Sequence, residues 1–131
     1  MKPLDDPEIV DWFHEAIKDE RTAELVFPHG LFDTAAFHCQ QSAEKRLKAV
    51  MVAVGLQPPH VHDLRILIDR LADVGVVLVG IDHLAGPLTA HAVRSRYPGF
   101  GDLTEREARD AMEAAWTIRA AVLALFAVDK P

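Results

Sequence analysis

The apolar residues of this chain recur every three or four positions over several long stretches, the spacing that lets an α-helix bury one face. The first stretch has its apolar residues at Ile9, Phe13, Ala16 and Ile17. Asp6 precedes it as a capping residue, and Pro7 suits the first helical position, where no N–H is needed. Pro28 and Gly30 predict the end of this helix.

A second and longer helix is predicted over residues 31–54, and Gly55 is placed to end it. Its apolar stripe consists of Phe32, Ala36, Cys39, Ala43, Leu47, Val50 and Val54. Phe37 lies away from this stripe. We therefore expect the helix to bury a second face.

The middle of the chain predicts a short helix and a stretch whose structure the pattern leaves open. Leucine and isoleucine at residues 64, 67, 68 and 71 give one amphipathic helix, and Asp63 sits at its start, where a carboxylate is favoured. Residues 74–80 are rich in valine between glycines, which suits an extended segment.

Two more helices are predicted toward the C-terminus. One covers residues 81–94, with a kink or restart at Gly86-Pro87. It should end near Arg96, because Pro98 disfavours helical geometry at Tyr97. The last begins at a capping box that pairs Thr104 with Glu107. Its stripe consists of Ala108, Ala111, Met112, Ala115, Ile118, Val122 and Leu125.

Together these elements predict an all-α fold, an up-and-down bundle of four to five helices in a single domain over residues 1–131. Half of the residues are hydrophobic and the net charge is -6, which argues against a surface that coats nucleic acid. Cys39 is the single cysteine, as in a reducing compartment. Because neither a signal peptide nor a membrane-spanning stretch is evident, we expect a cytoplasmic protein with no membrane contact.

Two groups of charged residues are candidates for a binding site. Arg96 ends one predicted helix close to the start of the next, where free backbone donors favour a phosphate. Gln41, Glu44, Lys45 and Lys48 share a side of the second helix, and Glu44 could hold Arg96 by a charge-assisted pair. Both groups also have an ordinary interpretation, in which Arg96 complements the helix dipole and the second group faces solvent.

The seven histidines do not form a metal motif. His60 and His62 are the nearest pair, and no HExxH or Cys/His spacing occurs, so we expect no metal ion. Walker, GxGxxG and nucleophile-elbow motifs are absent, and we expect no cofactor.

Three separated motifs resemble the HEPN family of nucleotide- and RNA-associated helical domains. They are Phe37-His38-x-Gln40-Gln41-x-x-Glu44-Lys45-x-Leu47-Lys48, His62-Asp63-Leu64 and Arg96-Tyr97-Pro98. Their order is similar to that of the members that stand beside a small nucleotidyltransferase. The resemblance implies a helical, often homodimeric domain, and in many members a metal-independent ribonuclease or a toxin that the nucleotidyltransferase neutralises.

The ribonuclease members carry an arginine, four to six further residues and then a histidine. Arg96 matches the arginine, but Gly101, Asp102 and Leu103 stand where the histidine is expected. A general base is needed to take the proton from a ribose 2′-hydroxyl. We therefore expect little or no RNA cleavage, with His91 or His62 as the replacement base if the alternative, a ribonuclease toxin, is correct.

The favoured interpretation is a nucleotide- or RNA-binding, regulatory HEPN domain in a nucleotidyltransferase-linked, toxin–antitoxin-like system. Its binding residues are expected to be Arg96, Tyr97, Gln41, Glu44 and Lys48. The expected partners are a cognate nucleotidyltransferase, a nucleotide or RNA, and a second copy of the chain. A purely structural dimerisation module is the remaining alternative.

Overall fold

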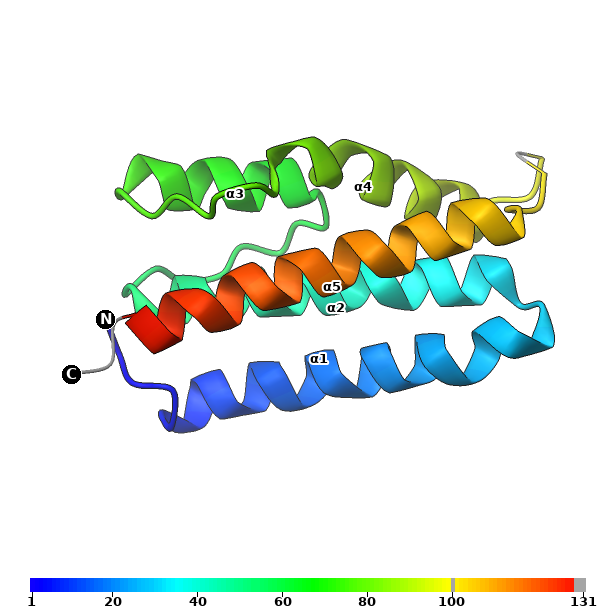
Figure 1. Ribbon diagram of the computed structural model, residues 1–131. Helices are drawn as coiled ribbons and strands as arrows, with labels where there is room; N and C mark the ends of the chain where they lie inside the picture. The colour runs from blue at the N-terminus through cyan, green and yellow to red at the C-terminus, as the bar shows by residue number, and fades with distance from the viewer. Residues whose placement is uncertain (100, 129–131) are drawn as a thin grey trace.

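The computed structural model describes residues 1–99 and 101–128, which form five α-helices, one 3-10 helix and no strand (Figure 1). The elements are α1 (Pro7–Val26), η1 (Phe27–His29), α2 (Phe32–Ala53), α3 (Leu64–Asp73), α4 (Asp82–Arg96) and α5 (Glu105–Val128). The prediction of an all-helical bundle is confirmed.

The four long helices run up and down, and α2 lies among the other three (Figure 1). α2 packs against α1, α4 and α5, while the shorter α3 packs against α2 and α4. The start of α2, the end of α4 and the start of α5 meet at one end of the bundle (Figure 1). This arrangement brings residues 33–37 together with residues 94–99 and 101–103, although they are far apart in the sequence.

Local signals set the ends of α1. The Asp6 carboxylate accepts hydrogen bonds from the backbone N–H groups of Glu8, at 3.0 Å, and Ile9, at 3.4 Å. After α1 the chain passes through η1 and turns at Gly30, whose φ of 77° favours glycine. The prediction that Ile17 belongs to the core is wrong, since 44% of it is exposed. α1 borders mainly α2, so its buried face is narrow.

α2 is buried on almost every side. From residue 34 to residue 53, only Thr34, Phe37, His38, Gln41 and Lys45 are not buried. The expected second buried face is therefore confirmed. Because helices of the same chain cover it, this face does not by itself require a second copy of the protein.

A buried ion-pair network joins α1, α2 and α5. The Arg46 guanidinium donates to both oxygens of Glu20, at 2.6 and 2.9 Å, and Arg119 donates to one of them at 3.3 Å. Ser42 Oγ donates to the same carboxylate at 3.0 Å. Glu20 and Arg46 are 4% and 3% exposed, and the bidentate pair satisfies charges that would otherwise be costly to bury.

The segment from α3 to α4 differs in part from expectation. Residues 74–81 form turns and irregular backbone, in which Val79 is 86% exposed, so the expected extended segment is not seen as a strand. α4 runs continuously through Gly86 and Pro87, so the predicted restart is not seen. It ends at Arg96 as predicted, with Tyr97 extended at φ -124° and ψ 126°.

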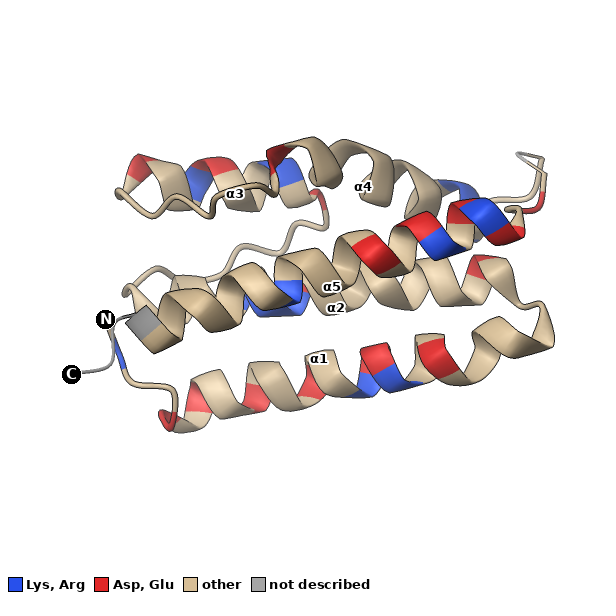
Figure 2. Ribbon diagram, in the orientation of Figure 1, with Lys and Arg blue, Asp and Glu red and all other residues tan. Residues whose placement is uncertain are grey.

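Charged residues are spread unevenly over the bundle. Acidic residues recur along α1, and the charges of α5 concentrate in its N-terminal half, toward the turn from α4 (Figure 2). Among the described residues, no helix combines the length and apolar character of a membrane span.

Candidate functional site

Arg96 stands at the end of α4 with its guanidinium over the ring of Phe37, at 5.5 Å from Cζ to the ring centroid. Arg96 is exposed, and Phe37 is half-buried on α2. Within residues 1–99 and 101–128, Arg96 makes no ion pair or hydrogen bond. The ring thus positions a guanidinium whose N–H donors remain open to a ligand.

Arg94, rather than Arg96, ties α4 to α5. Its guanidinium pairs with Glu107, and hydrogen bonds to Thr104 and Arg94, with the Arg94 charge, hold the pKa of Glu107 below its ordinary value. The backbone N–H of Thr104 donates to Glu107 at 3.0 Å, and the Glu107 N–H donates to Thr104 Oγ1 at 3.1 Å. This confirms the capping box. Arg94 therefore has the bracing role that the ordinary interpretation assigned to Arg96.

Two backbone donors directly before α5 are already engaged within the protein. Thr104 N–H is held by Glu107, and Leu103 N–H donates to the Asp33 carboxylate at 2.7 Å. These bonds reduce the number of free donors at this helix start. The expectation that Arg96 acts together with the remaining donors stays a prediction.

Two hollows adjoin Arg96. The first, of about 390 Å³, lies between the turn and the start of α2 and is lined by Asp33, Arg94, Ser95, Arg96, Tyr97, Pro98, Gly99, Gly101 and Asp102. The second, of about 360 Å³, is lined by Asp33, Thr34, Phe37, Ser95 and Arg96. Two carboxylates border the first hollow and one the second, so an anion is better accommodated on the Phe37 side.

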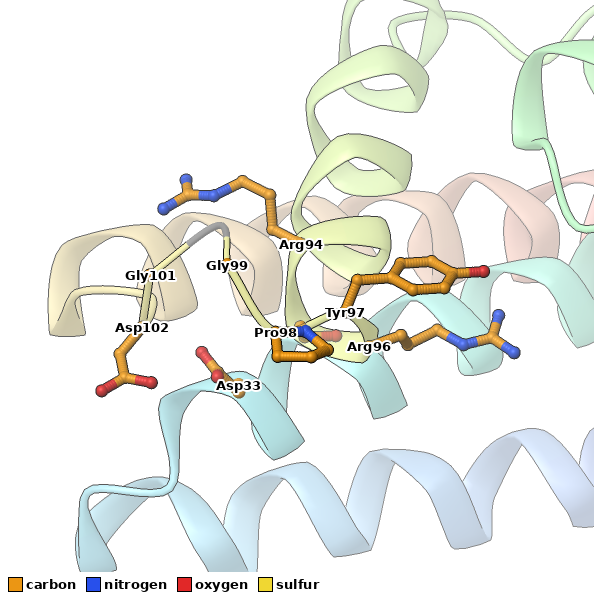
Figure 3. Close-up of a pocket in the computed structure, with 9 residues that line it drawn as sticks. Asp33, Arg94, Arg96, Tyr97, Pro98, Gly99, Gly101 and Asp102 are labelled. Atoms are coloured by element: carbon orange, nitrogen blue, oxygen red, sulfur yellow. The ribbon is translucent and has the colours of Figure 1, made fainter.

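The side chains around the turn point in two directions. Arg96 and Tyr97 extend to one side, whereas Arg94 extends to the other and Asp33 and Asp102 lie below the turn (Figure 3). Tyr97 is 57% exposed. An exposed tyrosine and a free arginine on one side form a pair suited to stacking on a base and contacting its phosphate.

Glu44 and Lys48 do not belong to this group. They are 4% and 6% exposed, and Lys48 Nζ donates to Glu44 at 3.0 Å. The other Glu44 oxygen lies 3.0 Å from His62 Nδ1. The expected pair between Glu44 and Arg96 is thus not formed. Phe37, beneath Arg96, precedes Glu44 by two helical turns, roughly 10 Å along the axis.

Gln41 lies on the part of α2 that its neighbours leave uncovered. We call the five residues Thr34, Phe37, His38, Gln41 and Lys45 the open face of α2. Their spacing of three, four and seven positions places them on one side of the helix. Gln41 and Arg96 therefore border the same surface, with Phe37 shared between the two groups.

The open face also contains a pair that sequence reasoning missed. His38 Nδ1 lies 2.8 Å from an oxygen of Asp19 on α1, and Lys45 Nζ donates to the other oxygen. His38 stood inside the first motif, but its partner is 19 positions away on another helix. The contact forms because α1 buries Asp19 against α2, and only the packing of these two helices could have revealed it.

The two histidines expected as replacement bases are elsewhere. His91 lies on the α5 side, 3.9 Å from Glu107, and its Nδ1 has no hydrogen-bond partner among the described residues. His62 is 65% exposed and bound to Glu44. Within the described residues, no three His, Cys, Asp or Glu side chains gather as a metal site would need.

Comparison with known proteins places these features in context. The family model of the HEPN domain matches residues 9–125. The fold is similar to the crystal structure of TT1696 from Thermus thermophilus, with a TM-score of 0.80 and 27% sequence identity, covering 91% of this chain and 98% of that one. No curated protein matches the chain.

Proposed function

Because this chain belongs to the HEPN domain family, we propose that it binds RNA or a nucleotide through Arg96 and Tyr97. The observation that carries the proposal is the guanidinium of Arg96, stacked on Phe37 and unpaired within residues 1–99 and 101–128. Membership of the family supports a nucleotide- or RNA-related role in general. The residues around Arg96 supply the chemistry for it.

The ligand is a single-stranded RNA segment or a nucleotide rather than a duplex. A net charge of -6 disfavours long phosphate tracks, whereas one arginine beside aromatic rings suits one or two unstacked bases. Arg96 contacts the phosphate, and the exposed ring of Tyr97 stacks on a base. Thr34 lines the adjoining hollow and offers a hydroxyl group to the ribose, whereas Ser95 Oγ donates to the Ala92 carbonyl at 2.7 Å and can there only accept.

A pair of arginine variants tests this site. In fluorescence anisotropy with a labelled single-stranded RNA, Arg96→Ala should weaken binding by about 1.5–3 kcal/mol, the range for hydrogen bonds to a charged group. Arg94→Ala is the matched control, because Arg94 is committed to Glu107. It should lower thermal stability and leave the affinity unchanged. Equal affinity for the Arg96→Ala variant and the unaltered protein would refute the proposal.

At the level of the cell, we propose that the chain is the HEPN component of a nucleotidyltransferase-linked, toxin–antitoxin-like system. The similarity of its three motifs to members beside a small nucleotidyltransferase supports this role. Induced expression should slow growth, and an adjacent nucleotidyltransferase gene should restore it. Unaffected growth on induction would contradict the proposal.

A structural dimerisation module is the second candidate. Exposed apolar side chains on α1 favour it, since Val10 is 46% exposed and Ile17, two turns later on the same side, is 44% exposed. A homodimer is compatible with either function. A chain that dimerises but binds neither RNA nor nucleotides would support the module.

A further inference from the structure

The hollow between the turn and the start of α2 differs in charge from the Phe37 side of the site. Asp33 and Asp102 line it, and its volume is about 390 Å³. Arg94 also lines it, but its guanidinium extends away from Asp33 and pairs with Glu107 (Figure 3). Carboxylates repel a phosphate and accept hydrogen bonds, so this hollow suits a neutral group that carries N–H donors.

The carboxylate of Asp33 is held in one orientation. Its Oδ1 accepts from the backbone N–H of Leu103 at 2.7 Å, and Leu103 is itself buried. The Asp33 side chain points from α2 toward the turn (Figure 3). Within residues 1–99 and 101–128, no group forms a hydrogen bond or an ion pair with Oδ2. One oxygen thus positions the carboxylate, while the other is open to a ligand.

The turn side of this hollow suits a flat ring. Pro98 lines it with an apolar face beside Asp33 (Figure 3). Gly99 and Gly101 line it without side chains, and a Cβ at either position would meet no atom within 4 Å. A planar base can therefore lie against backbone and one proline ring, with its edge toward the Asp33 carboxylate.

Among the RNA bases, guanine matches a carboxylate best. Its Watson–Crick edge carries two neighbouring donors, N1–H and the 2-amino group, which pair with the two oxygens of one carboxylate. Oδ1 of Asp33 keeps a second lone pair for this contact after it accepts from Leu103. Adenine and cytosine present an amino donor next to an acceptor, and uracil presents an N–H between two carbonyls. An acceptor that faces a carboxylate is repelled.

We propose that Asp33 recognises guanine in a single-stranded RNA whose phosphate is held by Arg96. The inference rests on the proposed function, because Arg96 must hold the strand. A phosphodiester has a nucleoside on either side, so one base stacks on Tyr97 and the other enters the hollow at Asp33.

The position of Asp33 fits this arrangement. Asp33 lines both hollows, and Arg96 also lines both. Asp33 precedes Phe37, the ring beneath Arg96, by about one helical turn, roughly 6 Å along the axis of α2. One nucleotide spans such a distance from its phosphate to its base.

A purely structural Asp33 would bind RNA of every sequence alike. Such a residue would only hold the turn against α2 through Leu103, which needs one of its oxygens. Recognition of guanine needs both oxygens. The two interpretations therefore differ in how RNA affinity depends on the base.

A series of labelled RNA strands measures this dependence by fluorescence anisotropy. Each is a short oligouridine whose central base is guanine, hypoxanthine, adenine or uracil. Hypoxanthine keeps N1–H but lacks the 2-amino group. The guanine strand should bind about ten- to a hundredfold more tightly than the hypoxanthine strand, the range for one hydrogen bond to a charged group. The adenine strand should bind no more tightly than the uracil strand.

Two aspartate variants and one arginine variant assign the preference to Asp33. Asp33→Asn keeps an acceptor for Leu103 but turns an N–H donor toward the donors of guanine. It should bind the guanine and hypoxanthine strands equally and the uracil strand as the unaltered protein does. Asp73→Asn, an exposed position at the end of α3, is the matched control and should keep the preference. Arg96→Ala should weaken all strands by the same factor.

The outcomes separate this inference from the proposed function. If the unaltered protein binds none of the strands, both fail. If it binds all of them with equal affinity, the proposed function stands and the recognition of guanine fails. A preference for guanine that persists in Asp33→Asn would overturn the assignment to Asp33.

Discussion

The guanidinium of Arg96 lies over the ring of Phe37, which joins the end of α4 to the exposed side of α2. This contact places an unpaired arginine at a fixed position without neutralising its charge. Arg94, two positions earlier, has its charge paired with Glu107. The two arginines of one helix end therefore have separate roles.

Replacing the ring should therefore weaken ligand binding. Phe37→Leu keeps an apolar side chain but removes a cation–π contact worth about 0.5–1 kcal/mol at an exposed site. RNA affinity, measured by anisotropy, should fall by a few-fold, less than for Arg96→Ala. Phe27→Leu is the control, because Phe27 lies beneath Arg109. A loss in both variants would indicate a general effect on folding rather than on the site.

The network around Glu20 should make the protein sensitive to acid. Burial acts to raise the pKa of Glu20, but hydrogen bonds and charge from Arg46, with Ser42, outweigh it and the pKa is lowered. The folded state therefore holds this proton less readily than the unfolded chain. The stabilisation is complete above the unfolded carboxyl pKa of about 4.3 and is lost as pH falls through the folded value.

Urea unfolding at decreasing pH measures this effect. Arg46→Ala should cost about 3–5 kcal/mol at neutral pH, because it leaves a buried carboxylate without its main partner. Glu20→Gln should flatten the decline between neutral and acidic pH. The same slope in Glu20→Gln and the unaltered protein would assign the acid sensitivity to other carboxylates.

Cys39 should be chemically inert in the folded protein. The thiol is fully buried, and burial raises its pKa to about 12, so almost no thiolate forms at neutral pH. A thiol reagent such as Ellman's should react with it only after unfolding in guanidinium. Rapid labelling of the folded chain would show that the α1, α2 and α5 packing opens readily.

Restoring the family histidine should not restore cleavage. Gly101 has a φ of 77°, a left-handed conformation, and a Cβ added there meets no atom within 4 Å. Gly101→His should therefore cost about 1–2 kcal/mol of stability. The new ring would point into open space. Thermal melting and RNA cleavage check both parts, and a clear gain of cleavage would contradict the expected orientation.

The oligomeric state is open to a direct measurement. We expect a homodimer, and light scattering at micromolar concentration should give twice the monomer mass of 14.5 kDa. If the exposed apolar side of α1 is the interface, Ile17→Glu should yield monomers. Val79→Glu is the control, because Val79 is exposed on the segment after α3. A monomeric unaltered protein would refute the dimer.

The sequence alone determined where the helices begin and end, because those signals act between near neighbours. Asp6 caps α1 through residues two and three positions later, and Thr104 pairs with Glu107 three positions away. Pro98 ends α4 by restricting the residue directly before it. Such interactions are encoded locally, so the helices and the bundle could be predicted from residue order. The family followed from the resemblance of three motifs.

The partners of the charged side chains were decided by tertiary structure. Glu44 pairs with His62 rather than with Arg96, and Asp19 holds His38 across 19 positions. A helical pattern gives the direction of a side chain around the axis of its own helix. It does not give the rotation of the neighbouring helix or its position along that axis. Packing of α1 and α4 against α2 sets these two quantities, and with them the residues that border Arg96.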